Sequence, residues 1–187
     1  PCIENGNDVS LIGTYLENDL IDEISKSEHP ALKVVMPKKL KIEKFDKIKE
    51  YSDADLIVCA VSSLGVDWFI DQISRIKNNK LNIVLLTKGL AVQEGKLITI
   101  SQKIKSELKK KGFADVVISA IKGPCLATGL ANKMRTGTVI ANQNIEIAKS
   151  IQKKITTEYY STETSEDIDG VEFCGAIKNI YSMLIGA

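Results

Sequence analysis

Short apolar runs alternate along this chain with longer segments in which apolar residues recur at helical spacing. Residues 56–61 form a nearly continuous apolar run, which is typical of a strand covered on both faces of a parallel sheet. In residues 16–27 apolar side chains recur every four positions, which indicates a helix with one apolar face. The whole pattern predicts strands at 8–12, 56–61, 83–86, 116–121, 138–141 and 158–161, and helices at 16–27, 41–51, 66–77, 96–111, 145–155 and from about 170 onward.

Strands separated by helical segments indicate βαβ units, and therefore an α/β fold with a doubly wound, Rossmann-like parallel sheet. Right-handed crossovers then place helices on both faces of the sheet. In such sheets ligands bind at the carboxyl ends of the strands. We therefore expect the chemistry in the loops that directly follow strands.

The glycine-rich phosphate loop with which dinucleotide folds begin, GxGxxG, does not occur in the sequence. Residues 1–7 instead resemble the end of a helix and a turn, leading directly into the strand at 8–12. We therefore expect that the first strand, the phosphate loop and most of the first helix precede Pro1, about 15 to 20 residues by usual element lengths. The expected domains are a truncated cofactor-binding domain at 1–162 and the start of a helical domain at 163–187.

Composition excludes several classes of function. The net charge is only +1, which provides no basic surface for nucleic acid. No apolar stretch approaches the ~20 residues that a membrane span requires. The four cysteines are far apart without a CxxC pair, which favours free thiols in a reducing cytoplasm and argues against a metal site. The sequence leaves open whether the chain forms a homodimer.

Two candidate segments directly follow predicted strands. In Thr87-Lys88-Gly89 the lysine could hold an anion, although Lys88 could equally be a solvated turn residue. In Gly123-Pro124-Cys125-Leu126-Ala127 the small residues would let a ligand approach the backbone, although an ordinary strand-to-helix turn has the same composition.

The third candidate is Lys178, on the last predicted helix. No carboxylate stands three or four residues away on either side, and its helical face is mostly apolar or small. Partial burial would lower the pKa of this lysine toward the range useful for proton transfer, unless the side chain extends its ammonium into water. We interpret His29, the single histidine, as structural, and Trp68 as a packing residue.

Together these segments resemble the NAD(P)-dependent glycerol-3-phosphate dehydrogenases over essentially the whole chain. Three motifs occur in that family's order and spacing, and Gly175-Ala176-Ile177-Lys178-Asn179-Ile180 is the most specific of them. The other two are Thr87-Lys88-Gly89-Leu90 and Gly123-Pro124-Cys125-Leu126-Ala127, and residues 5–9 and 13–14 resemble the family's second-strand region.

The resemblance implies hydride transfer between NAD or NADP and a phosphorylated substrate, with dihydroxyacetone phosphate and sn-glycerol 3-phosphate interconverted to supply phospholipid synthesis. In the family the lysine that matches Lys178 exchanges the proton, and the lysine that matches Lys88 contacts both substrate and cofactor. The resemblance further implies substrate binding by Gly123, Cys125 and Asn179, and cofactor binding by Thr14 and Ala127.

Some features depart from the family pattern. A hydroxyl or another small residue often replaces Cys125, and a thiol is the weaker hydrogen-bond partner. The family's helical domain, which supplies an Asp and an Arg-Asn pair, is not in this sequence, so we expect the fragment alone to be inactive. Neither Asp nor Glu stands at the end of the second strand, because Glu17 comes a few residues late, so the preference between NAD and NADP stays open.

The sequence is also compatible with two alternative functions. One is another dehydrogenase of the 6-phosphogluconate or ketopantoate reductase kind, which also places a lysine on the helix after the Rossmann domain. The other is a non-catalytic, nucleotide-sensing Rossmann module, which would have no use for Lys178.

Overall fold

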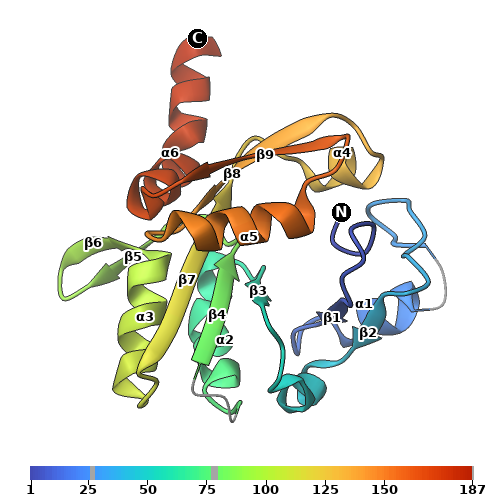
Figure 1. Ribbon diagram of the computed structural model, residues 1–187, viewed down its shortest axis with the longest axis horizontal. Helices are drawn as coiled ribbons and strands as arrows, with labels where there is room; N and C mark the ends of the chain where they lie inside the picture. Colours follow the sequence, from blue (N-terminus) through green and yellow to red (C-terminus); the bar gives the residue numbers. More distant parts are fainter. Residues whose placement is uncertain (26–27, 77–79, 187) are drawn as a thin grey trace.

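The computed structural model describes residues 1–25, 28–76 and 80–186 and contains a central five-stranded sheet (Figure 1). The spatial order of the strands is β3-β4-β7-β8-β9. Their bounds are β3 Ile57–Cys59, β4 Lys80–Leu85, β7 Asp115–Lys122, β8 Thr136–Ala141 and β9 Tyr160–Ser165. The α/β class and the Rossmann-like architecture are thus confirmed.

The sequence predicted a wholly parallel sheet, but the observed sheet is mixed. Strands β3, β4 and β7 are parallel, β8 is antiparallel to β7, and β9 is parallel to β8. The connection from β7 to β8 contains only the five-residue helix α4, Ala127–Ala131. Strand β8 therefore begins at the edge of the sheet where β7 ends and runs in the opposite direction. A β8 parallel to β7 would need a longer crossover connection.

A second, two-stranded parallel sheet pairs β1, Ser10–Ile12, with β2, Lys41–Glu43, and helix α1, Asn18–Ile24, connects them. The predicted helix at 41–51 is therefore wrong at its start, and only Phe45–Tyr51 is helical, as a 3₁₀ helix. In a doubly wound fold the first strand lies between the second and the fourth. Among the described residues no strand lies between β1 and β3, where the expected first strand would pair.

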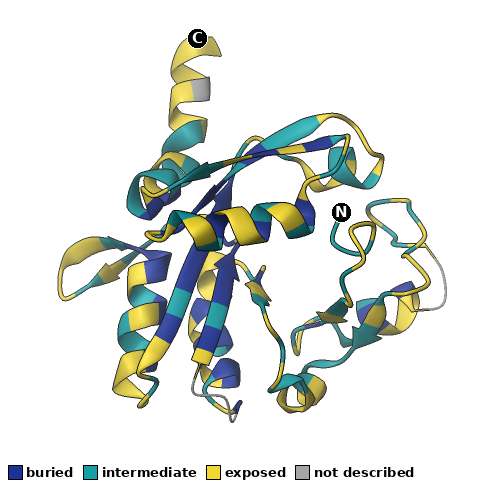
Figure 2. Cartoon of the chain, in the orientation of Figure 1, coloured by how far each residue is buried: buried dark blue, intermediate teal, exposed yellow. Residues whose placement is uncertain are grey.

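Helices cover both faces of the large sheet. Helices α2, Val66–Ile73, and α3, Ile100–Lys110, share one apolar core with β3, β4 and β7, whereas α5, Ile145–Ile155, packs on the opposite face. Figure 2 shows the buried residues concentrated on the strands and on the inward helix faces. The predicted helix ends at residues 26–27, 77 and 187 lie outside the described residues. No helix in the described part of the chain is long and apolar enough to cross a membrane.

The predicted helix at 96–111 begins later than expected, because a hairpin precedes it. Strands β5, Leu90–Gln93, and β6, Lys96–Thr99, are antiparallel around Glu94 and Gly95, whose φ angles are 51° and 74°. Two consecutive positive φ angles are what a tight hairpin turn requires. Helix α3 then begins with a capping box, in which the Thr99 hydroxyl accepts from the amide of Gln102 at 3.3 Å.

The last helix, α6, spans Ile168–Gly186 and begins against the large sheet (Figure 1). Strand β9 continues to Ser165 and α6 begins at Ile168, so most of the stretch between the predicted last strand and last helix is itself strand or helix. Ile168 belongs to the core on the α3 side, and the Asp169 carboxylate accepts from the Thr99 hydroxyl at 3.1 Å. The first turns of α6 are thus fixed to the sheet, whereas its last turns are exposed (Figure 2).

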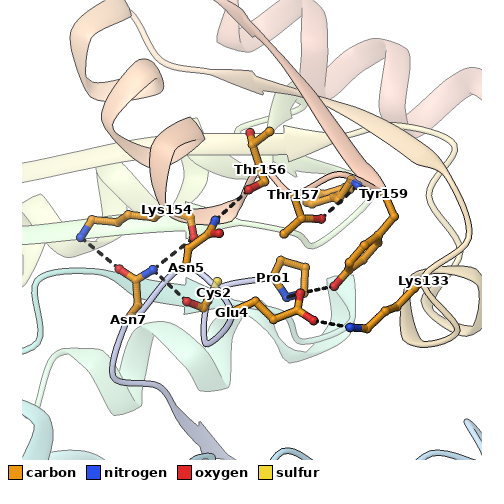
Figure 3. Close-up of polar contacts among 11 residues, drawn as sticks. Pro1, Cys2, Glu4, Asn5, Asn7, Lys133, Lys154, Thr156, Thr157 and Tyr159 are labelled. Carbon is orange, nitrogen blue, oxygen red and sulfur yellow. Dashed lines mark hydrogen bonds and ion pairs between the residues drawn. The ribbon is translucent and has the colours of Figure 1, made fainter.

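The segment 1–7 forms turns that attach to the side of the large sheet (Figure 3). The side-chain amide of Asn5 donates to the carbonyl of Thr156 at 2.8 Å. The Glu4 carboxylate lies 2.7 Å from the Lys133 ammonium and accepts a hydrogen bond from the Tyr159 hydroxyl. Polar contacts therefore hold this segment, which leads directly into the small sheet, against the end of α5 and β9.

Candidate active site

The candidate residues after β4 and β7 lie at one edge of the sheet. The register pairs Leu85 with Ala120 in parallel strands, so Lys88 and Gly123 leave neighbouring strands at the same level. This confirms that both residues lie at the carboxyl ends of adjacent parallel strands. Lys88 is exposed and is therefore open to an anionic ligand.

The buried hydroxyl of Thr87 connects two loops at this edge. It donates to the carbonyl of Val61, in the loop after β3, at 2.8 Å, and lies 3.5 Å from the buried Sγ of Cys59. Burial raises the pKa of the Cys59 thiol, so this cysteine is a packing residue in its neutral form. Gly89 has a φ of 128°, and a Cβ there would lie 3.3 Å from the Cβ of Ser63. The turn after β4 is therefore closely constrained on both sides of Lys88.

Gly123 is required for close packing between strands. A Cβ at this position would lie 2.8 Å from the carbonyl oxygen of Gly137 and 2.9 Å from the Cα of Thr138. Both atoms belong to the backbone of β8, which cannot rotate away as a side chain can. The structure thus gives this glycine a packing role, independent of any contact with a substrate.

Cys125 and Ala127 lie on the connection that follows. Cys125 is half-buried beside the core on the α5 side, and its thiol lies 3.9 Å from the carbonyl of Leu126, a weak contact. Ala127 is exposed at the start of α4.

Helix α6 carries the remaining two candidates. Lys178 is half-buried and Asn179 is exposed. The helix is positioned by Glu172, which is 1% exposed and whose carboxylate accepts from the amide of Ser101 at 3.3 Å. Because Ser101 lies in the first turn of α3, the carboxylate also meets the positive end of that helix dipole. Burial raises the pKa of Glu172, and the Ser101 hydrogen bond and the Lys122 charge oppose that increase.

Lys122 and Glu172 are buried charged residues that the sequence analysis missed. Lys122 is the last residue of β7, which extends one residue beyond the predicted strand, and it directly precedes Gly123. A lysine before a glycine in the turn after an apolar strand was the signal that identified Lys88, and Lys122-Gly123 has the same pattern. Glu172 had a weaker signal, a single carboxylate between Val171 and Phe173.

Thr14 lies two residues after the end of β1, a strand of the small sheet, and is separated from the other candidates in the topology. Its amide donates to the carboxylate of Glu17 at 2.8 Å, so the Glu17 side chain folds back to the strand end. The ring of Tyr15 contacts the ring of Trp68 on α2 with a centroid separation of 5.8 Å. Trp68 is therefore a packing residue, as predicted, and it holds the loop after β1 beside the large sheet.

His29 has the structural role that the sequence analysis gave it. Its Nδ1 accepts hydrogen bonds from the amides of Ala31 and Leu32, both at 3.2 Å. Across residues 1–25, 28–76 and 80–186, no cluster of three or more His, Cys, Asp or Glu side chains could hold a metal ion.

Sequence comparisons with known proteins show one family. Residues 2–148 match the family model described as NAD-dependent glycerol-3-phosphate dehydrogenase N-terminus. An NADP(+)-dependent glycerol-3-phosphate dehydrogenase of Archaeoglobus fulgidus is 30% identical over 192 residues, which cover 99% of this chain and 54% of that protein. A glycerol-3-phosphate dehydrogenase [NAD(P)+] of Thermotoga sp. is 28% identical and covers 98% of this chain and 51% of its own length.

Solved structures give the same result. The crystal structure of glycerol-3-phosphate dehydrogenase from Coxiella burnetii superposes with a TM-score of 0.81 at 25% identity, covering 99% of this chain and 55% of that one. The chain thus spans about half the length of the relatives that it matches.

Proposed function

Because the chain belongs to the family of the NAD-dependent glycerol-3-phosphate dehydrogenase N-terminus, we propose that it binds NAD or NADP and serves in glycerol 3-phosphate metabolism. The reaction would be reversible hydride transfer between NAD(P)H and dihydroxyacetone phosphate, giving sn-glycerol 3-phosphate for glycerophospholipid synthesis in the cytoplasm. The family match over residues 2–148 carries this proposal. The common position of Lys88 and Gly123 at one sheet edge supports it.

In this proposal Lys178 exchanges the proton. Reduction of a ketone places negative charge on its oxygen, and a nearby ammonium stabilises that charge and delivers the proton. Lys178 is half-buried on α6, so water only partly screens its charge. Asn179, next on the helix, would bind the substrate from the same segment.

Lys88 would bind the phosphorylated substrate and the cofactor, with Gly123 and Cys125 as further substrate contacts. Lys88 is exposed on a turn whose neighbours are fixed by the Thr87 hydroxyl and by the close approach of Gly89 to Ser63. An ammonium on a constrained turn loses little conformational freedom when it binds an anion.

The nicotinamide cofactor would supply or accept the hydride, and the chain would hold it through Thr14, Lys88 and Ala127. A hydrogen-bond acceptor that fits the adenosine end of such a cofactor is present. The Glu17 carboxylate, held 2.8 Å from the Thr14 amide, lies at the end of β1. An acidic group there suits the ribose hydroxyls of a dinucleotide.

We also propose the domain division into a cofactor-binding domain over 1–162 and the start of a helical domain over 163–187. The exposed second half of α6 supports this, because Ile180, Leu184 and Ile185 are apolar and uncovered in this chain (Figure 2). The first turns of α6 nevertheless belong to the core of the large sheet.

The direct test is turnover by the full-length protein. NADH or NADPH is mixed with dihydroxyacetone phosphate, and loss of the reduced-cofactor absorbance is followed. Parallel reactions contain ketopantoate, or 6-phosphogluconate with the oxidised cofactor. Turnover of either of these, and not of dihydroxyacetone phosphate, would transfer the protein to the alternative dehydrogenase class. Cofactor binding without turnover of any substrate would indicate the non-catalytic module.

A further inference from the structure

Lys122 is a buried lysine beside the candidate site for which the proposed reaction has no use. Its side chain is 5% exposed. The Nζ atom donates to the carbonyl of Thr87, and to the carbonyl of Leu85 at 3.4 Å. Leu85 is the last residue of β4 and Thr87 directly precedes Lys88 in the turn, so the ammonium of Lys122 holds the backbone next to Lys88.

The aliphatic part of the same side chain supports α6. A Cβ on Gly175 would lie 3.0 Å from the Cγ of Lys122, 3.1 Å from its Cδ and 3.2 Å from its Cβ. The helix therefore rests directly on this side chain at its glycine. Lys178 follows Gly175 by about one helical turn on the same face. One residue of β7 thus contacts both segments that carry the candidate lysines.

Glu172 is the second buried charged residue in this region. Burial lowers the pKa of Lys122, and the negative charge of Glu172 opposes that decrease. Glu172 is itself held by the Ser101 amide at the start of α3. The two buried charged groups therefore lie on neighbouring elements, α6 and β7, and each is hydrogen-bonded to backbone groups.

We propose that Lys122 is a positioning residue that fixes the Thr87–Lys88 turn and helix α6 relative to each other, so that Lys88 and Lys178 meet one substrate. Stability alone is a weak reason for this group, because apolar side chains of similar volume often replace buried charges without loss. The inference rests on the proposed function for the roles of Lys88 and Lys178. The placement of Lys122 does not depend on that function.

The first test needs no turnover. Cys59 is fully buried, with its Sγ 3.5 Å from the Thr87 hydroxyl, so its alkylation reports on opening of this turn. In the full-length protein, Lys122→Met should raise the rate of Cys59 alkylation by iodoacetamide about threefold to tenfold, the effect of losing one or two hydrogen bonds on a local opening. Lys122→Arg should stay near the wild type. Thermal unfolding of each variant, followed by circular dichroism, separates opening of this turn from a general loss of stability.

The second test is kinetic. Lys122→Met should raise KM for dihydroxyacetone phosphate about tenfold and lower kcat, while Lys122→Arg recovers most of both. Lys149→Met is the matched control, because Lys149 is exposed on α5 and pairs with Glu146 at 2.9 Å. It should leave alkylation and kinetics unchanged.

Gly175→Ala approaches the same contact from α6, and it keeps the test available if Lys122→Met does not fold. The added methyl group should displace the Lys122 side chain and raise Cys59 alkylation in the same direction. Unchanged Cys59 alkylation in both variants, or an increase no larger than the general loss of stability predicts, would overturn the inference. An inactive wild type would refute the proposed function, while the alkylation result would still decide the role of Lys122.

Discussion

Replacing Gly123 with alanine would put a methyl group where the backbone of β8 already lies. The new Cβ would be 2.8 Å from the carbonyl oxygen of Gly137, 2.9 Å from the Cα of Thr138 and 3.0 Å from its Cγ2. Because Lys122 pairs with Val139 in the β7–β8 ladder, the two strands would have to separate at this point. The substitution therefore disturbs the pairing of the antiparallel strands β7 and β8.

The expected loss follows from two opposing effects. Forcing a methyl group into a closely packed site costs about 1–3 kcal/mol. Removing the freedom of glycine in the unfolded chain returns about 0.4–1 kcal/mol. We therefore expect Gly123→Ala to lower the free energy of unfolding by about 1–2 kcal/mol, and Tm by about 2–8 °C.

Gly129→Ala is the matched control. A Cβ on Gly129 would lie 3.9 Å from the Cβ of Met134, an ordinary contact, and Gly129 lies within helix α4. Its replacement should be neutral or stabilising by up to about 1 kcal/mol. Thermal and urea unfolding of both full-length variants measures the difference. If Gly123→Ala were as stable as Gly129→Ala but had a raised KM, the packing argument would fail, and the glycine would serve the substrate.

Four further predictions concern charged residues. Lys178→Met in the full-length protein should lower kcat by about 10²–10⁴ with little change in cofactor affinity, and near-normal turnover would refute its role in proton transfer. Lys88→Met should instead raise KM for the substrate and lower the affinity for the cofactor. Glu17→Gln should raise kcat/KM with NADPH relative to NADH, because a carboxylate at the end of β1 repels a ribose 2′-phosphate; an unchanged ratio of the two values would place the ribose elsewhere. The ion pair with Lys133 lowers the pKa of Glu4 to about 2, so its contribution to stability should be present above about pH 4.5 and lost as the pH falls toward 2. Urea unfolding of Glu4→Gln and wild type across that range should show a difference that shrinks with falling pH, and a constant difference would contradict the assignment.

Hydrophobic periodicity predicted the large elements and failed at short ones. Helix α5 was predicted at Ile145–Ile155 and is found there. Residues 41–43 and 96–99 were predicted to be helical and are strands. Each is a short run next to a true helix, and periodicity cannot separate three or four residues from the longer pattern beside them. Pairing with β1 and with β5 decides their conformation.

The candidate site was predictable where its signal was local. Lys88 and Gly123 follow apolar strands, and the order of strands and helices implied that the strands would be neighbours. Glu17 was judged to come too late in the sequence, yet its side chain reaches back to the amide of Thr14. The direction in which a side chain folds depends on the turn around it, and residue spacing does not contain that information.

The sequence by itself determined the α/β class, the strand-end positions of the candidate residues and the resemblance to one dehydrogenase family. These properties follow from hydrophobic periodicity and from motifs whose residues are close together in the chain. Only the tertiary structure decided that β8 runs antiparallel to β7. It also decided that Lys122 contacts both the Thr87 carbonyl, next to Lys88, and Gly175, one helical turn before Lys178. Such contacts join residues that are far apart in the chain, and their energies depend on burial, which exists only once the sheet and its helices are packed together.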